Sequence, residues 1–175
     1  YKNAQRLLLL VNQLMDLQKN QSGTMELQVT ENNVYEFVTE IYCAFNQIAQ
    51  TNEITFTLDC RDREFQAWYD KVLLEKVVFN LLSNAFKYTP SGKDIRMLVK
   101  CIPAGELEEL YRKEVAPSAL YMMLQVVDAG CGIPPQERDK VFTPFYRVPE
   151  TAGVNVPGTG IGLSLVYSIV KLHKG

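Results

Sequence analysis

The stretch that decides the fold is Asn80-Leu81-Leu82-Ser83-Asn84-Ala85-Phe86-Lys87-Tyr88, within a chain of 175 residues. It ends a predicted helix over 70–88, which Asp70 can cap and which the sequence Thr89-Pro90-Ser91-Gly92 terminates. At 100° per residue, Asn80, Asn84 and Lys87 share an arc of about 60°. Beside it lies an apolar arc of about 140°, made of Leu74, Val77, Val78, Leu81, Leu82, Ala85 and Tyr88.

The polar stripe on this helix has two interpretations. Most polar stripes are solvated faces, yet exposed helix positions favour Glu, Lys and Gln over Asn, which is a poor helix former. A carboxamide oxygen can ligate a hard cation such as Mg²⁺, and an ammonium can pair with phosphate oxygens. On spacing alone, both a solvated face and a site for metal-bound phosphate stay open.

Two glycine-rich segments follow. Asp128-Ala129-Gly130-Cys131-Gly132-Ile133 comes directly after an apolar strand, so the backbone can approach a ligand while the carboxylate accepts a hydrogen bond. Gly158-Thr159-Gly160-Ile161-Gly162-Leu163 opens a helix, and the N–H groups at a helix start suit phosphate. Each is weak alone, because the first is equally explained as a turn and the second fits neither a Walker A nor a Rossmann loop.

Composition bounds the function classes. The chain is 47% hydrophobic and 22% charged, as in a globular domain with a core. Its net charge of -2 and pI near 5.5 argue against general nucleic-acid binding. No apolar run approaches the roughly 20 residues that span a bilayer. The four cysteines have no C-x-x-C spacing, and the sequence contains only one histidine, His173. Reduced thiols are therefore favoured over a zinc site. The cysteines are Cys43, Cys60, Cys101 and Cys131.

The remaining pattern predicts an α/β fold with mostly antiparallel strands. We expect strand 54–60 to pair with strand 65–69 across a charged turn, and we expect the Pro- and Gly-punctuated segment 130–158 to be a functional lid. Further strands are expected near 25–30, 95–102 and 119–128, and helices over 1–20, 33–51, 105–115 and 162–174. The helix over 1–20 carries leucines at the spacing of helices that pack side by side.

Together these motifs resemble the ATPase superfamily shared by histidine kinases, DNA gyrase B, Hsp90 and MutL. Residues 80–88 resemble the N box, and Asp128-Ala129-Gly130-Cys131-Gly132 resembles the first glycine box. Phe142-Thr143-Pro144-Phe145-Tyr146-Arg147 resembles the F box of an ATP lid, and residues 158–163 resemble the second glycine box. The resemblance implies a Bergerat ATP-binding fold, in which one long helix precedes a mixed, mostly antiparallel sheet covered by helices on one face.

The resemblance also implies a role for each matching residue. Asn84 would ligate Mg²⁺, Lys87 would pair with phosphate, and Asp128 would accept a hydrogen bond from the adenine amino group of ATP. The implied catalytic residues are Asn80, Lys87 and Arg147, and Phe142 and Phe145 would anchor the lid. The full set implied to bind the nucleotide is Asn80, Asn84, Lys87, Tyr88, Asp128, Gly130, Gly132, Ile133, Phe142, Phe145, Gly158, Thr159, Gly160, Gly162 and Leu163.

Residue 80 distinguishes the branches of the superfamily. The resemblance places a Glu there in the ATP-hydrolysing branch, as the base that activates water, whereas Asn80 cannot take a proton. Transfer of the γ-phosphoryl group to a histidine, as in a sensor histidine kinase, is therefore expected over hydrolysis. A nucleotide-binding pseudokinase and a serine-directed relative are the alternatives.

The resemblance extends to domain organisation and partners. Residues 1–22 resemble the end of the second helix of a dimerisation and histidine-phosphotransfer domain, and 23–175 resemble a C-terminally truncated catalytic domain. The acceptor histidine is expected before Tyr1, so this fragment should bind nucleotide without phosphorylating itself, and His173 is expected to be a helix-end residue. Implied partners are the phosphotransfer helix of the same protein, a second copy in a homodimer and a response regulator. Contact with nucleic acid or membrane is not expected, and the implied location is the cytoplasm, in the cytoplasmic part of a membrane-bound bacterial sensor.

Overall fold

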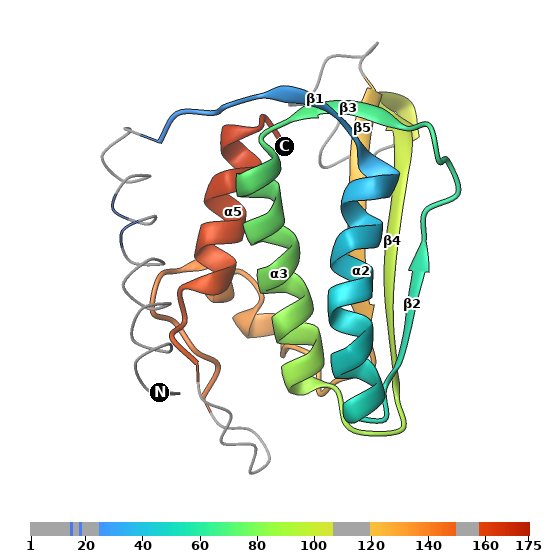
Figure 1. Cartoon of the computed structure of the whole chain (residues 1–175). Coiled ribbons are helices and arrows are strands. Elements are labelled where there is room, and N and C mark those ends of the chain that lie inside the picture. Colours follow the sequence, from blue (N-terminus) through green and yellow to red (C-terminus); the bar gives the residue numbers. More distant parts are fainter. Residues whose placement is uncertain (1–14, 16–17, 19–24, 107–119, 150–157) are drawn as a thin grey trace. The chain divides into compact units, whose positions relative to one another are not determined.

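A computed structural model describes residues 15, 18, 25–106, 120–149 and 158–175 (Figure 1). The chain forms two compact units, which we describe separately. The first contains residues 1–30, 69–88 and 131–175, and the second contains residues 31–68 and 89–130. Among the helices of the described ranges, none combines the length and apolarity needed to cross a membrane.

The second unit is built on a three-stranded sheet of order β2-β4-β5. Strand β2 (Thr55–Asp59) runs parallel to β4 (Asp94–Pro103), and β4 runs antiparallel to β5 (Leu120–Asp128). The sheet is therefore mixed, and its antiparallel pairing is the longer one, which confirms the predicted fold class. Alternate residues of β4 are buried, as period-two patterning requires: Ile95, Met97 and Val99.

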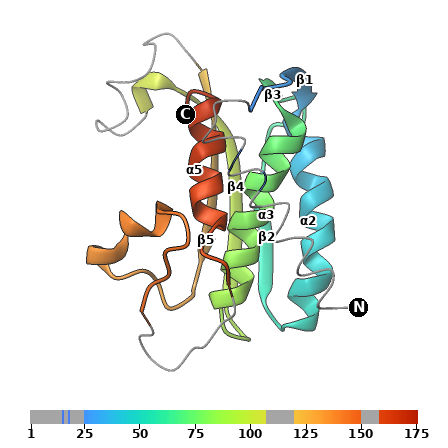
Figure 2. The same cartoon turned by 90° about the vertical axis from the view of Figure 1, so that its left-hand side faces the viewer.

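Helix α2 (Val34–Thr51) packs against β2 in the same unit (Figure 2). Its N-cap is Asn33, whose side chain accepts a hydrogen bond from the backbone N–H of Glu36 at 2.9 Å. The rings of Tyr42 on α2 and Phe56 on β2 lie 5.0 Å apart. The predicted helix over 33–51 is confirmed.

The expected pairing of strand 54–60 with strand 65–69 is wrong. Strand β3 (Gln66–Tyr69) instead pairs with β1 (Thr30–Asn33), while β2 pairs with β4. The Phe65 carbonyl, just before β3, accepts the backbone N–H of Val34 at 2.8 Å, so this segment bonds to the start of α2. A charged turn is compatible with a hairpin, but pairing with β4 places the buried side chain of Phe56 beside that of Ile95.

The first unit is built on two helices, α3 (Lys71–Tyr88) and α5 (Gly162–Leu172), which pack on each other. The predicted helix over 70–88 is confirmed, and Asp70 caps it by accepting the backbone N–H of Leu73 at 3.0 Å. Between the helices, residues 131–149 include two short 3₁₀ turns, η2 (Pro135–Glu137) and η3 (Lys140–Phe142). Turn η3 also packs on α5.

Three other expectations need correction or fall partly or wholly outside the described residues. The strand expected near 25–30 is instead β1, which begins only at Thr30. The helix expected over 1–20 lies almost wholly outside the described residues. Of the helix expected over 105–115, the structure describes only the end of the 3₁₀ turn η1 (Ala104–Glu106).

Candidate nucleotide site

The polar stripe of α3 lies at the edge of the core of the first unit. Asn80, Asn84 and Lys87 are all half-buried, while Leu82 and Ala85, on the adjacent apolar face, are buried. A fully solvated face would leave these three side chains exposed. The intermediate burial therefore shows that the stripe is not a fully solvated face.

Asn80 is held in one orientation and faces the start of α5. Its Nδ2 donates a hydrogen bond to the Lys76 carbonyl at 2.8 Å. Its Oδ1 points toward Gly162, because a Cβ added to Gly162 would lie 2.7 Å from it. The absence of a side chain at residue 162 thus admits Asn80. The structure brings the N box and the second glycine box together at this point.

Lys87 makes a second contact between the same two segments. A Cβ added to Gly158 would lie 2.6 Å from Lys87 Nζ. The same ammonium lies 4.8 Å from the ring centroid of Tyr88, a cation–π distance. Within the described residues, no carboxylate forms an ion pair with Lys87. A half-buried ammonium beside a glycine-rich segment is available to an anionic ligand.

Asn84 is half-buried, and within the described residues its side chain makes no hydrogen bond. A carboxamide in such a position keeps its oxygen available as a ligand for a hard cation. The residue therefore fits the chemistry of the Mg²⁺ role that the sequence suggested. Thr159, in the second glycine box, is already engaged locally, because its hydroxyl accepts the N–H of Ile161 at 3.2 Å.

Phe145, in the segment expected to form a lid, bonds to Gly160 in the second glycine box. The N–H of Phe145 donates to the Gly160 carbonyl at 2.9 Å, and both residues have positive φ, 66° and 71°. A Cβ on Gly160 would lie 2.6 Å from the Phe145 carbonyl carbon, so only glycine fits here. The Phe145 side chain remains 59% exposed.

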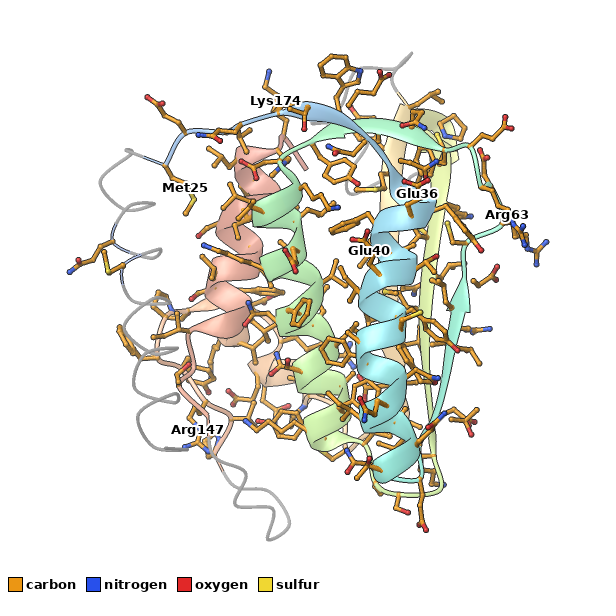
Figure 3. All side chains as sticks on the ribbon, in the orientation of Figure 1. Met25, Glu36, Glu40, Arg63, Arg147 and Lys174 are labelled. Carbon is orange, nitrogen blue, oxygen red and sulfur yellow. The ribbon has the colours of Figure 1, made fainter. Side chains whose placement is uncertain are left out.

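The other lid residues have different surroundings. The ring of Phe142 lies 5.7 Å from that of Tyr167 on α5, so Phe142 anchors η3 to that helix. Arg147, labelled in Figure 3, lies in the exposed segment that follows Tyr146. Leu163 is half-buried in the first turn of α5, and Ile133 is 39% exposed before η2.

The first glycine box begins at the end of β5. Asp128 ends β5 in the second unit, opposite Ile95 on β4, and is exposed. Its Oδ1 accepts the N–H of Gly130 at 2.9 Å, which fixes the carboxylate over a tight turn. Gly132 belongs to the first unit and has φ of 70°. Asp128 therefore keeps a second carboxylate oxygen for a ligand.

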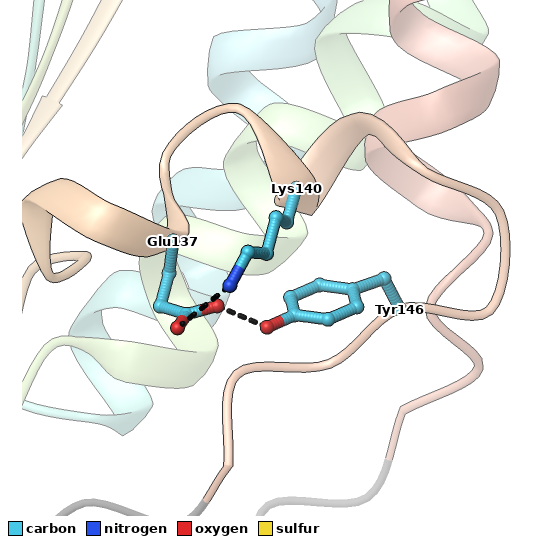
Figure 4. A network of polar contacts seen from close by, with 3 residues as sticks. All are labelled: Glu137, Lys140 and Tyr146. Atoms are coloured by element: carbon cyan, nitrogen blue, oxygen red, sulfur yellow. Dashed lines mark hydrogen bonds and ion pairs between the residues drawn. The ribbon is translucent and has the colours of Figure 1, made fainter.

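A polar network within the lid involves residues to which the sequence assigned no role (Figure 4). The Tyr146 hydroxyl donates to Glu137, and Lys140 Nζ lies 3.4 Å from Glu137 Oε1. The hydrogen bond from Tyr146 lowers the pKa of Glu137, and Lys140 lowers it further, although desolvation opposes this. The same hydrogen bond, with desolvation, raises the pKa of Tyr146.

Sequence reasoning also missed a cluster at the other end of the helix pair. The backbone N–H of Asp70 donates to His173 Nε2 at 3.2 Å. The two residues lie 103 positions apart in the sequence, so no local pattern predicts this contact. The sequence did single out both residues, Asp70 as an N-cap and His173 as a helix-end residue, but it assigned each only a local role.

The fold and these motifs have counterparts among known proteins. Residues 69–175 match the family of histidine kinase-, DNA gyrase B- and HSP90-like ATPases. Histidine kinase P4 of Formosa agariphila is 34% identical over 179 residues, which cover 99% of this chain and 12% of that protein. The histidine kinase AdeS of Acinetobacter baumannii has a TM-score of 0.70 at 20% identity, covering 98% of this chain and 70% of that one. Full-length ShkA in complex with AMPPNP has a TM-score of 0.73 at 19% identity, covering 98% and 32%.

The chain therefore belongs to the histidine kinase-, DNA gyrase B- and HSP90-like ATPase family. Within that family it is homologous to the catalytic domains of sensor histidine kinases. It spans only 12%, 10% and 16% of the length of the first three curated relatives that it matches.

Proposed function

We propose that this chain binds Mg-ATP and is the catalytic domain of a two-component histidine kinase, in which the γ-phosphoryl group passes to a histidine on another domain. The observation that carries the proposal is the meeting of Asn80 and Lys87 on α3 with Gly162 and Gly158 of the second glycine box. An amide and an ammonium there face two glycines, which have no side chains. That arrangement suits a triphosphate, which requires close backbone approach and neutralised charge.

Each residue has a proposed part in binding. Lys87 pairs with phosphate, and Asp128 accepts a hydrogen bond from the adenine amino group. Asn84, whose side chain makes no hydrogen bond among the described residues, is the proposed ligand of Mg²⁺. When bound, Mg²⁺ would neutralise the charge that develops on the phosphates. Arg147 is the proposed contact of the γ-phosphate.

The identity of residue 80 supports transfer over hydrolysis. The Asn80 amide has no proton-accepting group, and its Nδ2 is occupied by the Lys76 carbonyl. In the proposed reaction an imidazole nitrogen attacks the γ-phosphorus, the bond to the bridging β–γ oxygen breaks, and ADP leaves. The imidazole loses its N–H proton to solvent or a base on the acceptor domain. No base that activates water is needed on this chain.

The whole-protein assignments are part of the same proposal. Residues 1–22 are the proposed end of a phosphotransfer helix, and 23–175 are the proposed catalytic domain. The proposed partners are that helix, a second copy of the protein and a response regulator, and the proposed location is the cytoplasm. AMPPNP is bound in the ShkA structure, and the fold shared with that protein supports a nucleotide role here.

Calorimetric titration of the purified chain with a non-hydrolysable ATP analogue and Mg²⁺ tests the binding site. We expect Asn84→Ala and Asp128→Ala each to lose about 1–3 kcal/mol of binding free energy, the cost of a lost polar contact. Asn46→Ala is the matched control for Asn84, because Asn46 is also half-buried on a helix and makes no hydrogen bond among the described residues. Asp94→Ala controls for Asp128, since it removes an exposed carboxylate at the start of β4. Equal losses in the controls would contradict the site.

A second experiment tests the reaction. The intact protein, incubated with ATP and Mg²⁺, is expected to yield a phosphoprotein that is stable to base and labile to acid, as a phosphohistidine is. A base-labile, acid-stable product would indicate serine phosphorylation. Nucleotide binding without any phosphoprotein would indicate a pseudokinase.

A further inference from the structure

Asp70 is a buried aspartate at which three parts of the first unit meet. Among the described residues it is the one buried residue with a charged side chain, with 6% of the residue exposed. Oδ1 accepts the N–H of Leu73 at 3.0 Å, and Oδ2 accepts the N–H of Gln28 at 2.9 Å. One carboxylate thus joins the first turn of α3 to the segment that enters the domain.

The backbone of Asp70 makes the third connection. Its N–H donates to His173 Nε2 at 3.2 Å, at the C-terminal end of α5. His173 Nδ1 lies 2.8 Å from the Ile169 carbonyl. Because a backbone N–H can only donate, Nε2 must be the unprotonated nitrogen, and Nδ1 must carry the hydrogen that Ile169 accepts. Only the neutral Nδ1–H tautomer makes both bonds.

The two ends of the α3–α5 pair are therefore held in different ways. At the end that carries the proposed phosphate site, Asn80 and Lys87 lie against Gly162 and Gly158. At the other end, a side chain-to-backbone bond fixes His173 to Asp70. Because Asp70 bonds to both Gln28 and His173, we expect a displacement of residues 25–29 to shift both helices and with them the contacts around Asn80.

We propose that Asp70 and His173 form a positioning junction that couples the segment around Gln28 to the α3–α5 pair and thus regulates nucleotide affinity. Figure 3 labels Met25 and Lys174, which lie on the entering segment and just after α5, respectively. The regulatory part of this proposal rests on the proposed nucleotide binding. The junction itself rests on the hydrogen bonds alone.

Conservative substitutions can remove the hydrogen bonds of Asp70 and His173 one at a time. Asn is as good an N-cap as Asp, but Asp70→Asn has one acceptor oxygen where the parent has two. It can therefore satisfy Leu73 or Gln28, not both. His173→Gln can place an amide oxygen near the position of Nε2, whereas His173→Asn places its amide near Nδ1 and leaves the Asp70 N–H without an acceptor. The Gln and Asn variants of His173 form a matched pair, because both carry a carboxamide and differ only in side-chain length.

Amide hydrogen exchange measured by NMR tests the junction in this chain. We expect exchange of Gln28 or Leu73 to rise about tenfold in Asp70→Asn, and exchange of Asp70 to rise similarly in His173→Asn but not in His173→Gln. Imidazole ¹⁵N shifts should report hydrogen on Nδ1 in the parent. Unchanged exchange in both Asp70→Asn and His173→Asn, in folded proteins, overturns the junction.

Titration with the Mg-ATP analogue tests the coupling. We expect the analogue to slow exchange of Gln28 in the parent, and we expect Asp70→Asn and His173→Asn to lose about three- to tenfold in affinity while His173→Gln stays near the parent. Altered exchange with parental affinity in all variants overturns the coupling. If the parent binds no nucleotide, the proposed function fails, and the exchange data still decide whether the junction exists.

Discussion

Gly162 lies so close to Asn80 that a Cβ on the glycine would be 2.7 Å from the amide oxygen of the asparagine. The two residues come from different motifs and different helices, and Asn80 is prevented from moving freely by its bond to the Lys76 carbonyl. The missing side chain at residue 162 is therefore a condition for the orientation of Asn80.

Gly162→Ala is expected to lower affinity for the Mg-ATP analogue by about 1–2 kcal/mol, or roughly five- to thirtyfold, because the new methyl group displaces the Asn80 amide. Stability should change little, since Ala is a better helix former than Gly by about 1 kcal/mol, which offsets part of the clash. Calorimetric titration and urea unfolding measure the two effects. Gly105→Ala, which adds its Cβ where no atom of the described residues lies within 4 Å, should leave affinity unchanged.

Gly158→Ala is expected to cost less affinity than Gly162→Ala. Its Cβ would meet Lys87 Nζ at 2.6 Å, but an ammonium at the end of a flexible side chain can move aside. The same titration, repeated at low and high salt, should show that the loss of affinity depends on salt, because the displaced group is the charged ammonium of Lys87. A loss as large as that of Gly162→Ala would contradict this assignment of rigid and flexible contacts.

Gly160→Ala is expected to destabilise the protein by about 2–4 kcal/mol. About 1–2 kcal/mol comes from the left-handed backbone at φ of 71°, and the rest comes from a methyl group forced to 2.6 Å from the Phe145 backbone. Gly92→Ala is the matched control, since Gly92 has φ of 77° and no atom of the described residues lies within 4 Å of its Cβ position. Gly92→Ala should therefore lose only the about 1–2 kcal/mol that comes from the left-handed backbone. Equal losses by urea unfolding would show that the lid ends do not pack as described.

Cys60 is expected to react more slowly with a thiol reagent at pH 8 than Cys43, Cys101 and Cys131. Those three are exposed, whereas Cys60 is half-buried, and burial together with the nearby Asp62 and Asp59 raises its pKa. A raised pKa leaves less reactive thiolate, so we expect one slow phase among four, slower by about tenfold. Cys60→Ser should remove that phase. Asp62→Asn should accelerate it, and an unchanged rate in that variant would count against the carboxylate effect.

Local chemistry made several elements predictable. Helix α3 begins and ends where Asp70 and the Thr89–Gly92 turn place its boundaries, and the cap bond to Leu73 is present. The four motifs together implied the fold class by their resemblance to a known family, and the strands expected near 95–102 and 119–128 are β4 and β5. In each case the signal lies within a few neighbouring residues or in a repeated spacing.

Features that depend on contacts between segments distant in the sequence could not be predicted. The pairing of β2 with β4 and of β3 with β1 is a choice among strands of similar pattern, and burial rather than turn chemistry decides it. The bond between Asp70 and His173 likewise has no local signature. Asn80 and Gly162 were each singled out by type, but their contact distance is a property of how α3 and α5 pack.

The last prediction concerns pH and the Glu137–Tyr146 bond. Tyr146 lowers the pKa of Glu137, so this contribution to stability is present above the unfolded value of about 4.3 and is lost as pH falls through the lower folded value. Glu137 raises the pKa of Tyr146, so the same bond is kept below about pH 10 and is lost as pH rises through the higher folded value. The free energy of unfolding of the parent minus that of Tyr146→Phe, measured in urea, should therefore be largest between these limits and decline on both sides. Glu137→Gln keeps an acceptor oxygen without a titrating group. In a Glu137→Gln background, the stability difference caused by Tyr146→Phe should therefore no longer decrease at acidic pH. A difference that stays constant across the whole range would mean that the two side chains are not bonded in solution.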